Sequence, residues 1–166
     1  MMIDKGKVLS LDDMSDRRTE LRRAKKALVF TNGCFDLLHL GHVRYLRQAR
    51  ELGDALVIGL NSDASIRKIK GGDRPILSQE ERAEILAALG FVDHIVIFDE
   101  PTAERLVAIL EPDVYVKGGD YTLDELPEAK IAESYGGKVT ILPLIPGHST
   151  TRIIERILSS YGGKQA

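Results

Sequence analysis

The chain has 166 residues, of which 43% are hydrophobic and 29% charged, so it is long enough for one domain with a substantial core of its own. Its formal net charge of -2 excludes the concentrated basic surface typical of nucleic-acid binding, so we expect no nucleic-acid partner. The absence of a signal-peptide core and of any apolar run long enough to span a bilayer, together with a single cysteine, predicts a cytoplasmic protein with no membrane partner.

Short apolar runs alternate with amphipathic stretches along the chain. The apolar runs predict strands at residues 27–30, 55–60, 94–98, 114–116 and 138–142. The amphipathic stretches predict helices at residues 41–52, 64–70, 79–89, 102–110, 123–135 and about 150–160. A helical extension is also expected ahead of the first strand, at about residues 8–26. This alternation predicts one doubly wound, Rossmann-like α/β domain over residues 1–166, with a five-stranded parallel sheet and helices on both faces.

The stretch TNGCFDLLHLGH, residues 31–42, joins the first predicted strand to the helix that follows it. In an open parallel sheet this position lies at the carboxyl edge, where ligands bind. If the helix begins near His39, then His39 and His42 share one face of its first turn, beside free backbone N–H groups and the positive end of the helix dipole. Such a group of donors suits phosphate. A zinc site fits less well, because paired histidines on a helix are usually four apart and Cys34 is a poor third ligand, so we predict no protein-bound metal.

The residues GCFD at 33–36, followed by HLGH at 39–42, resemble the signature of the HxGH nucleotidyltransferases, the cytidylyltransferase-like superfamily. A second match is HSTTRII at 148–154; in the superfamily this Ser/Thr stretch opens the last helix and binds the triphosphate. The resemblance extends over about residues 8–158. Within the superfamily, the stretches FTNGCFDLLHLGHVRYL, GLNSDASIRKIKGGDRPI and DVYVKGGDY resemble the adenylyltransferases that act on heptose 1-phosphates.

This resemblance implies a reaction in which a heptose 1-phosphate attacks the α-phosphorus of ATP and gives ADP-heptose, a precursor of cell-surface glycans, and pyrophosphate. Such a reaction requires the protein to position its reactants and to stabilise negative charge. Mg²⁺ is expected to be bound mainly through the ATP phosphates. The bifunctional relatives also carry a sugar-kinase domain that this sequence lacks, so a separate sugar kinase is expected in the pathway. A homodimer is expected because relatives are often dimers.

The resemblance also implies roles for individual residues. The catalytic group is expected to be His39 and His42, which would contact the phosphates, and Lys117, which would add a cation at a strand end. The nucleotide-binding group is expected to contain Asn32, Gly33, Cys34, Phe35, Gly41, Asp120, Ser149, Thr150 and Thr151. The acceptor-binding group is expected to contain Asp36, Lys68, Lys70 and Arg82.

Several of these residues have a purely structural alternative. Asp36 equally fits a residue that fixes the motif loop. Ser149 or a neighbouring threonine could simply cap the last helix. Lys68 and Lys70 could serve only to complement a helix dipole. Arg82 could form an ion pair with a nearby glutamate instead of contacting phosphate.

Two other functions remain open. The first is a cytidylyltransferase for glycerol 3-phosphate or another small phosphate, because such enzymes share both motifs. The loop KGGDY at 117–121 favours the heptose enzyme, although no single residue distinguishes adenine from cytosine. The second is a nucleotide-binding module without catalysis, which the complete set of His39, His42 and Lys117 disfavours.

Overall fold

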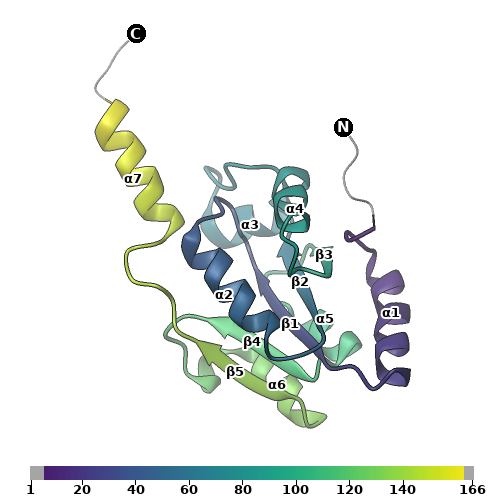
Figure 1. The fold of residues 1–166 in the computed structure, drawn as a ribbon. Coiled ribbons are helices and arrows are strands. Elements are labelled where there is room, and N and C mark those ends of the chain that lie inside the picture. Colours follow the sequence, from purple (N-terminus) through teal and green to yellow (C-terminus); the bar gives the residue numbers. More distant parts are fainter. Residues whose placement is uncertain (1–5, 163–166) are drawn as a thin grey trace.

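The protein is described here by a computed structural model that covers residues 6–162, and the fold is an α/β sandwich (Figure 1). Its five strands form one parallel sheet in the order β3-β2-β1-β4-β5. The strands are β1 (Leu28–Gly33), β2 (Ala55–Asn61), β3 (His94–Phe98), β4 (Val114–Gly118) and β5 (Lys138–Leu142). The helices of the described residues are α1 (Leu11–Arg23), α2 (Leu40–Arg50), α3 (Asp63–Lys70), α4 (Gln79–Ala87), α5 (Glu104–Leu110), α6 (Pro127–Ser134) and α7 (Thr150–Tyr161). The predicted doubly wound, Rossmann-like fold is therefore confirmed.

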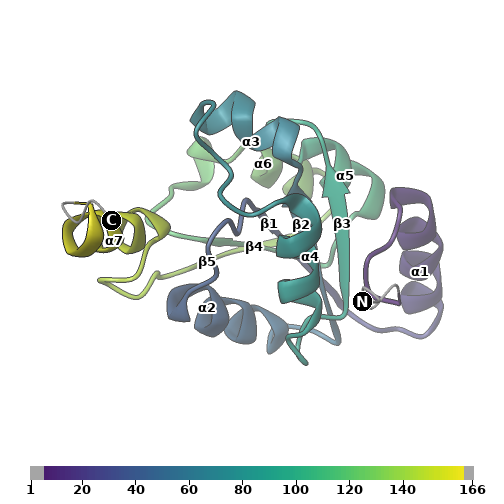
Figure 2. The same ribbon diagram turned by 90° about the horizontal axis from the view of Figure 1, so that it is seen from above.

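Both faces of the sheet are covered by helices. Figure 2 shows α2 and α4 against one face and α5 and α6 against the other, with α1 at the β3 edge. Each face has its own apolar core: one packs Tyr45 and Leu46 of α2 against the sheet, and the other packs Leu106 and Leu110 of α5. All seven residues of β2 are buried, because this strand has a neighbour on each side and a helix layer on each face.

Most predicted bounds differ from the observed ones by a few residues, and in three elements the difference has a clear physical reason. The helix expected at 123–135 is divided into a short 3-10 turn, Leu123–Glu125, and α6, which has Pro127 at its first position. A proline in the interior of a continuous helix would remove a hydrogen bond and clash with the preceding turn. Strands β1 and β4 extend past their apolar runs to Gly33 and Gly118, because backbone pairing continues through polar residues. These polar ends lie at the carboxyl edge of the sheet.

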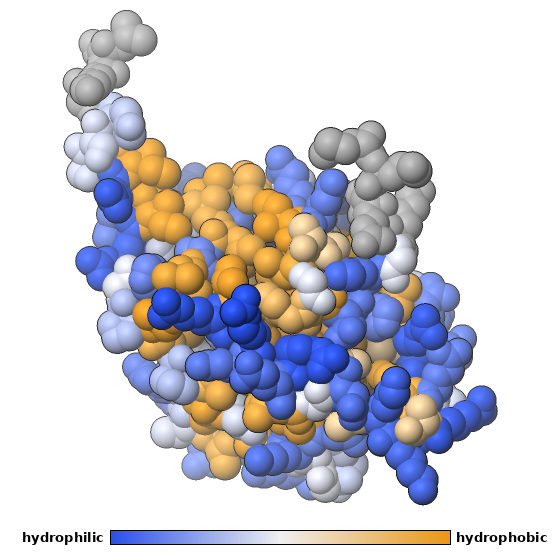
Figure 3. All heavy atoms as spheres, viewed as in Figure 1, coloured by the Kyte–Doolittle hydropathy of each residue, from blue (hydrophilic) through white to orange (hydrophobic). Residues whose placement is uncertain are grey.

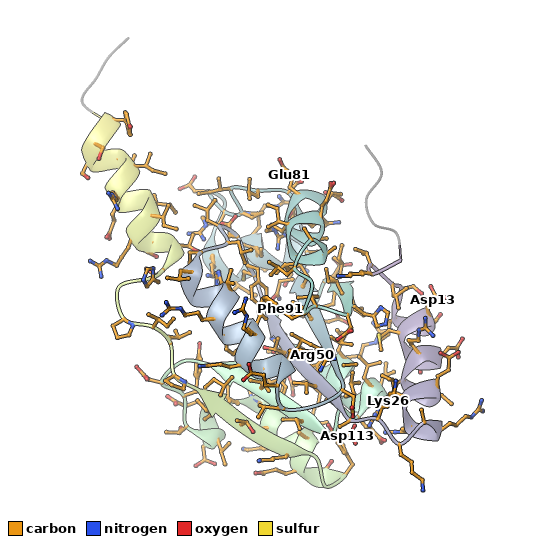
Figure 4. The ribbon with its side chains drawn as sticks, in the orientation of Figure 1. Asp13, Lys26, Arg50, Glu81, Phe91 and Asp113 are labelled. Atoms are coloured by element: carbon orange, nitrogen blue, oxygen red, sulfur yellow. The ribbon has the colours of Figure 1, made fainter. Side chains whose placement is uncertain are left out.

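Charged groups fasten the opposite, amino edge. The buried Arg18 of α1 donates to the carbonyls of Leu110 and Glu111 at 3.0 and 2.7 Å and to the Asp113 carboxylate at 2.8 Å. Asp113 also accepts from the Leu28 N–H at 2.7 Å, where β1 begins. In Figure 4, Asp113 and Lys26 lie together at this edge. Arg18 and Asp113 thus join α1, the start of β1 and the segment before β4 at the amino edge of the sheet.

Helix α7 extends away from the rest of the domain (Figure 1), and none of its residues is buried. Its exposed apolar residues include Ile157, Leu158 and Tyr161, and Figure 3 shows apolar surface along this helix. Only its first turn comes near the carboxyl edge of the sheet. None of the described helices is both long enough and apolar enough to cross a membrane.

Candidate active site

A cleft of about 410 Å³ opens at the carboxyl edge of the sheet, beyond the ends of β1, β2 and β4. This volume is in the range of pockets that hold small ligands. The predicted site residues in its wall are Asn32, Gly33, Cys34, Phe35, Asp36, His42, Lys70, Lys117 and Thr150. The other wall residues, which the sequence analysis missed, are Asn61, Ile69, Arg74, Pro101, Thr102, Tyr121, Glu125, Leu126, Pro127 and Glu128.

The two motif histidines form a stacked pair at the start of α2. His39 is the N-cap residue, and its ring lies 3.8 Å from the ring of His42 with an interplanar angle of 21°. The Phe35 ring packs against the other side of His42 at 5.1 Å. Gly41 makes this arrangement possible, because a Cβ atom there would lie 3.0 Å from the His39 ring. Gly41 therefore leaves room for the His39 ring, and it does not line the cleft as the prediction of a nucleotide contact would require.

Burial favours the neutral form of both histidines in the protein without ligand. The pKa of His42 is lowered to about 4, mainly by burial and also by the nearby His39 and Lys70. Burial and the neighbouring His148 also lower the pKa of His39. Within residues 6–162, the Nδ1 atoms of both rings are buried and have no hydrogen-bond partner. A bound anion beside the rings would favour the protonated form of each one.

His39 faces a second hollow of about 550 Å³, which lies against α7. The charged residues around it are Arg152, Arg156 and Glu155, so positive charge exceeds negative charge and the hollow suits an anion. Ser149 also lines it, but its hydroxyl accepts from the Arg152 N–H at 3.2 Å and caps α7. Because His39 and His42 stack on one another, the hollow and the cleft meet at the histidine pair. Of the three predicted hydroxyl residues, Thr150 reaches the cleft, whereas Thr151 is exposed and lines neither space.

Lys117 lies in the cleft wall near the end of β4. Its Nζ donates to the Asn32 Oδ1 at 3.4 Å, and the same oxygen accepts from the buried Tyr115 hydroxyl at 2.9 Å. Burial lowers the pKa of Lys117, while the charge of Glu128 acts in the opposite direction. The ammonium group is thus held by one amide oxygen and remains available to a phosphate.

Asp36 fastens the motif loop to the loop before α4. Its Oδ2 accepts from the Arg74 Nε at 2.5 Å, and its Oδ1 accepts from the N–H groups of Ile76 and Leu77 at 2.8 and 3.1 Å. Burial opposes the ionised form, but these donors hold the pKa of Asp36 below its usual value. These contacts favour its loop-fixing alternative over the predicted acceptor contact.

The predicted phosphate contact of Arg82 is corrected by the structure. The Arg82 side chain is fully buried, and its Nη1 donates to the carbonyls of Cys34 and Asn61 at 2.6 and 2.8 Å. Its Nη2 donates to the Asp63 carboxylate at 2.7 Å, and its Nε donates to the Leu77 carbonyl at 3.1 Å. The guanidinium therefore supports the cleft from beneath and does not line it.

Two further predicted residues, Lys68 and Asp120, are exposed and absent from the cleft wall. Arg74, which the sequence analysis passed over, is the cation that accompanies Lys70 there. Its position directly after Gly71, Gly72 and Asp73 was the available signal, because a glycine pair lets a following side chain fold back toward a site.

The parallel sheet, with this site at its carboxyl edge, is the Rossmann-like fold of the nucleotidyltransferases. Residues 30–156 match the cytidylyltransferase-like family, and the chain belongs to that family. It is 59% identical over 140 residues to the bifunctional protein HldE of Syntrophotalea carbinolica, covering 84% of this chain and 29% of that protein. It is 55% identical over 157 residues to the bifunctional protein HldE of Geobacter sulfurreducens, covering 95% of this chain and 32% of that protein. The chain thus spans about a third of the length of these relatives.

Two solved structures are also similar. The lipopolysaccharide core biosynthesis protein from Thermoplasma volcanium has a TM-score of 0.59 and 29% identity, over 72% of this chain and 97% of that chain. Pantoate-beta-alanine ligase from Francisella tularensis has a TM-score of 0.63 and 13% identity, over 96% of this chain and 80% of that chain. At this identity the second likeness supports the fold alone.

The lowered pKa values of the histidines predict a pH dependence of stability. Between pH 6.5 and 5, His42 is protonated in the unfolded chain but stays neutral in the folded protein. The free energy of unfolding therefore decreases as the pH falls through this window. We expect His42→Ala to reduce this slope, as measured by urea denaturation at each pH. An unchanged slope would contradict the assigned environment of His42.

The burial of Arg82 predicts a large loss of stability when its charge is removed. Arg82→Met leaves the Asp63 carboxylate and three carbonyl groups without their donor, which should cost about 3–5 kcal/mol. Arg17→Met, which removes an exposed ion pair with Glu20, is the control and should cost about 1 kcal/mol or less. Urea denaturation measures both. If Arg82→Met retained full stability and lost only phosphate affinity, Arg82 would be a ligand contact after all.

Proposed function

We propose that the protein transfers AMP from ATP to a heptose 1-phosphate and releases ADP-heptose and pyrophosphate. The observation that carries the proposal is the convergence of His42, Lys117 and Thr150 on one cleft, with His39 stacked behind His42. Support also comes from the family match and from 59% identity to a bifunctional HldE protein. The resemblance of the KGGDY loop to heptose 1-phosphate enzymes favours this acceptor.

In this proposal, ATP lies with its phosphates across the start of α2. His42 and Lys117 contact the α-phosphate, and the hollow beside His39 receives the β- and γ-phosphates near Arg152 and Arg156. An oxygen of the sugar phosphate forms a bond to the α-phosphorus while the bond from that phosphorus to the bridging oxygen breaks. The electron pair leaves with pyrophosphate. Donors held in advance at the start of α2 stabilise the charge that gathers on the oxygens in the transition state.

Mg²⁺ in this proposal enters with the ATP phosphates, because this ion keeps most of its waters and prefers phosphate oxygens. Among residues 6–162, no three His, Cys, Asp or Glu side chains gather into a metal site of their own. Since ATP is the substrate, we place the reaction in the cytoplasm. A sugar kinase must supply the sugar 1-phosphate, and the homodimer stays a prediction.

The substrate assignment is tested by a pyrophosphate-release screen that crosses ATP, CTP, GTP and UTP with heptose 1-phosphate, glycerol 3-phosphate and hexose 1-phosphates. We expect ATP with heptose 1-phosphate to give the highest kcat/KM. A preference for CTP with glycerol 3-phosphate would reject the heptose assignment and retain nucleotidyl transfer. The absence of turnover with every pair would favour a nucleotide-binding module.

The role of the histidine pair is tested by His42→Ala. If His42 contacts charge that develops in the transition state, kcat should fall roughly 10²–10³-fold, or about 3–4 kcal/mol, while the Kd for ATP changes little. His94→Ala, at the start of β3, is the control and should keep the kcat of the unaltered protein. Normal turnover by a folded His42→Ala protein would remove the histidine pair from the mechanism.

A further inference from the structure

The inner end of the cleft contains a buried carboxylate that the proposed reaction does not use. Glu128, at the start of α6, is 4% exposed and lines the cleft. A carboxylate next to a phosphate site is unfavourable for an anion, because like charges repel strongly in a partly desolvated space. Glu128 favours the charged form of Lys117, which accounts for part of its role, and the carboxylate also borders the open space of the cleft.

The hydrogen bonds of Glu128 leave part of its carboxylate free. Its Oε1 accepts from the Ala103 N–H at 2.9 Å. The neighbouring Tyr115 hydroxyl, which donates to the Asn32 Oδ1 at 2.9 Å, also lies within reach of the carboxylate. Burial and the charge of Glu128 raise the pKa of Tyr115, and the same charge opposes the lowering of the Lys117 pKa by burial. A carboxylate has about four acceptor positions, so Glu128, which lines the cleft, can still accept hydrogen bonds from a ligand.

The donors of two other polar side chains near Glu128 are already hydrogen-bonded to protein groups. The Asn61 Nδ2 donates to the Ser65 hydroxyl at 2.9 Å and to the Glu100 carbonyl at 3.5 Å. The Thr102 hydroxyl donates to the Glu104 carboxylate at 2.7 Å. Apart from Lys117, the polar groups around Glu128 thus present acceptors, whereas Lys70, His42 and Arg74 elsewhere in the wall present donors or positive charge.

One class of ligand matches both parts of the cleft. A sugar phosphate carries an anion at one end and several hydroxyl donors at the other. In-line transfer also requires the acceptor to approach from the side opposite the departing pyrophosphate. Since we propose that pyrophosphate leaves toward the hollow at His39 and α7, the acceptor lies on the side of Glu128.

We infer that Glu128 binds hydroxyl groups of the acceptor sugar and makes the cleft selective for a polyhydroxylated sugar phosphate. This inference rests on the proposed function and adds a specificity-determining residue to it. A carboxylate accepts hydrogen bonds from hydroxyl groups that shorter or deoxygenated acceptors lack, so Glu128 discriminates against such acceptors.

The direct test is Glu128→Gln, which keeps the side-chain shape and the acceptor for Ala103. The KM for heptose 1-phosphate should rise about 10- to 100-fold, as expected for the loss of a charge-assisted hydrogen bond, while the KM for ATP stays within about twofold. The control is Glu133→Gln, which alters an exposed glutamate of the same helix and should leave both values unchanged. An unchanged KM for the sugar phosphate overturns the inference. A change in the KM for ATP alone also overturns it and would assign Glu128 to the ribose. A change in kcat alone overturns it as well and would indicate action through Lys117.

A second measurement uses sugar 1-phosphates that each lack one hydroxyl group. With the unaltered protein, at least one of them should lose about 10- to 100-fold in kcat/KM relative to the full sugar, and Glu128→Gln should largely abolish that difference because the contact is already missing. Equal losses in both proteins overturn the inference, as does the absence of any loss in the unaltered protein. If the unaltered protein makes no ADP-heptose, the proposed function fails and the inference fails with it. If the unaltered protein makes ADP-heptose and Glu128→Gln has the same KM for heptose 1-phosphate, the inference alone fails.

Discussion

The cleft depends on the buried guanidinium of Arg82. Its donors reach the carbonyls of Cys34, just after β1, and Asn61, at the end of β2, together with the Leu77 carbonyl and the Asp63 carboxylate. Three chain segments that lie far apart in the sequence are thereby held at fixed separations. A buried charge is tolerated only when its hydrogen-bonding capacity is filled, so this network has little freedom to rearrange. A rigid loop after β1 is what allows the histidine pair to be held in place before a ligand arrives.

Asp36 extends the same constraint from the other side of the loop. It joins the motif loop to the N–H groups of Ile76 and Leu77 and to Arg74, and so brings the cation of Arg74 into the cleft wall. The residues that meet the ligand therefore differ from those that position them. Arg82 and Asp36 act through the backbone, whereas His42, Lys117 and Thr150 border the open space.

The sequence was sufficient for the parts of the site that are local. The strand–loop–helix unit around His39 and His42 is contiguous, and its spacing predicted a shared face that the stacked rings confirm. The role of Arg82 could not be predicted, because most of its partners come from two other segments, at Cys34 and at Asn61 to Asp63, and only the folded chain brings them together. Glu128 was missed for the same reason, since its partner Ala103 lies 25 residues away in the sequence.

Burial gives the cleft an electrostatic character that its composition conceals. The pKa values of His39 and His42 are lowered mainly by loss of water, which favours the neutral form of both rings without a ligand. Burial lowers the pKa of Lys117 as well. A phosphate that enters reverses these effects, because each negative charge favours the protonated form of a nearby base. In the proposed reaction, bound triphosphate would therefore increase the positive charge of the site, and nucleotidyl transfer is when the developing charge must be stabilised.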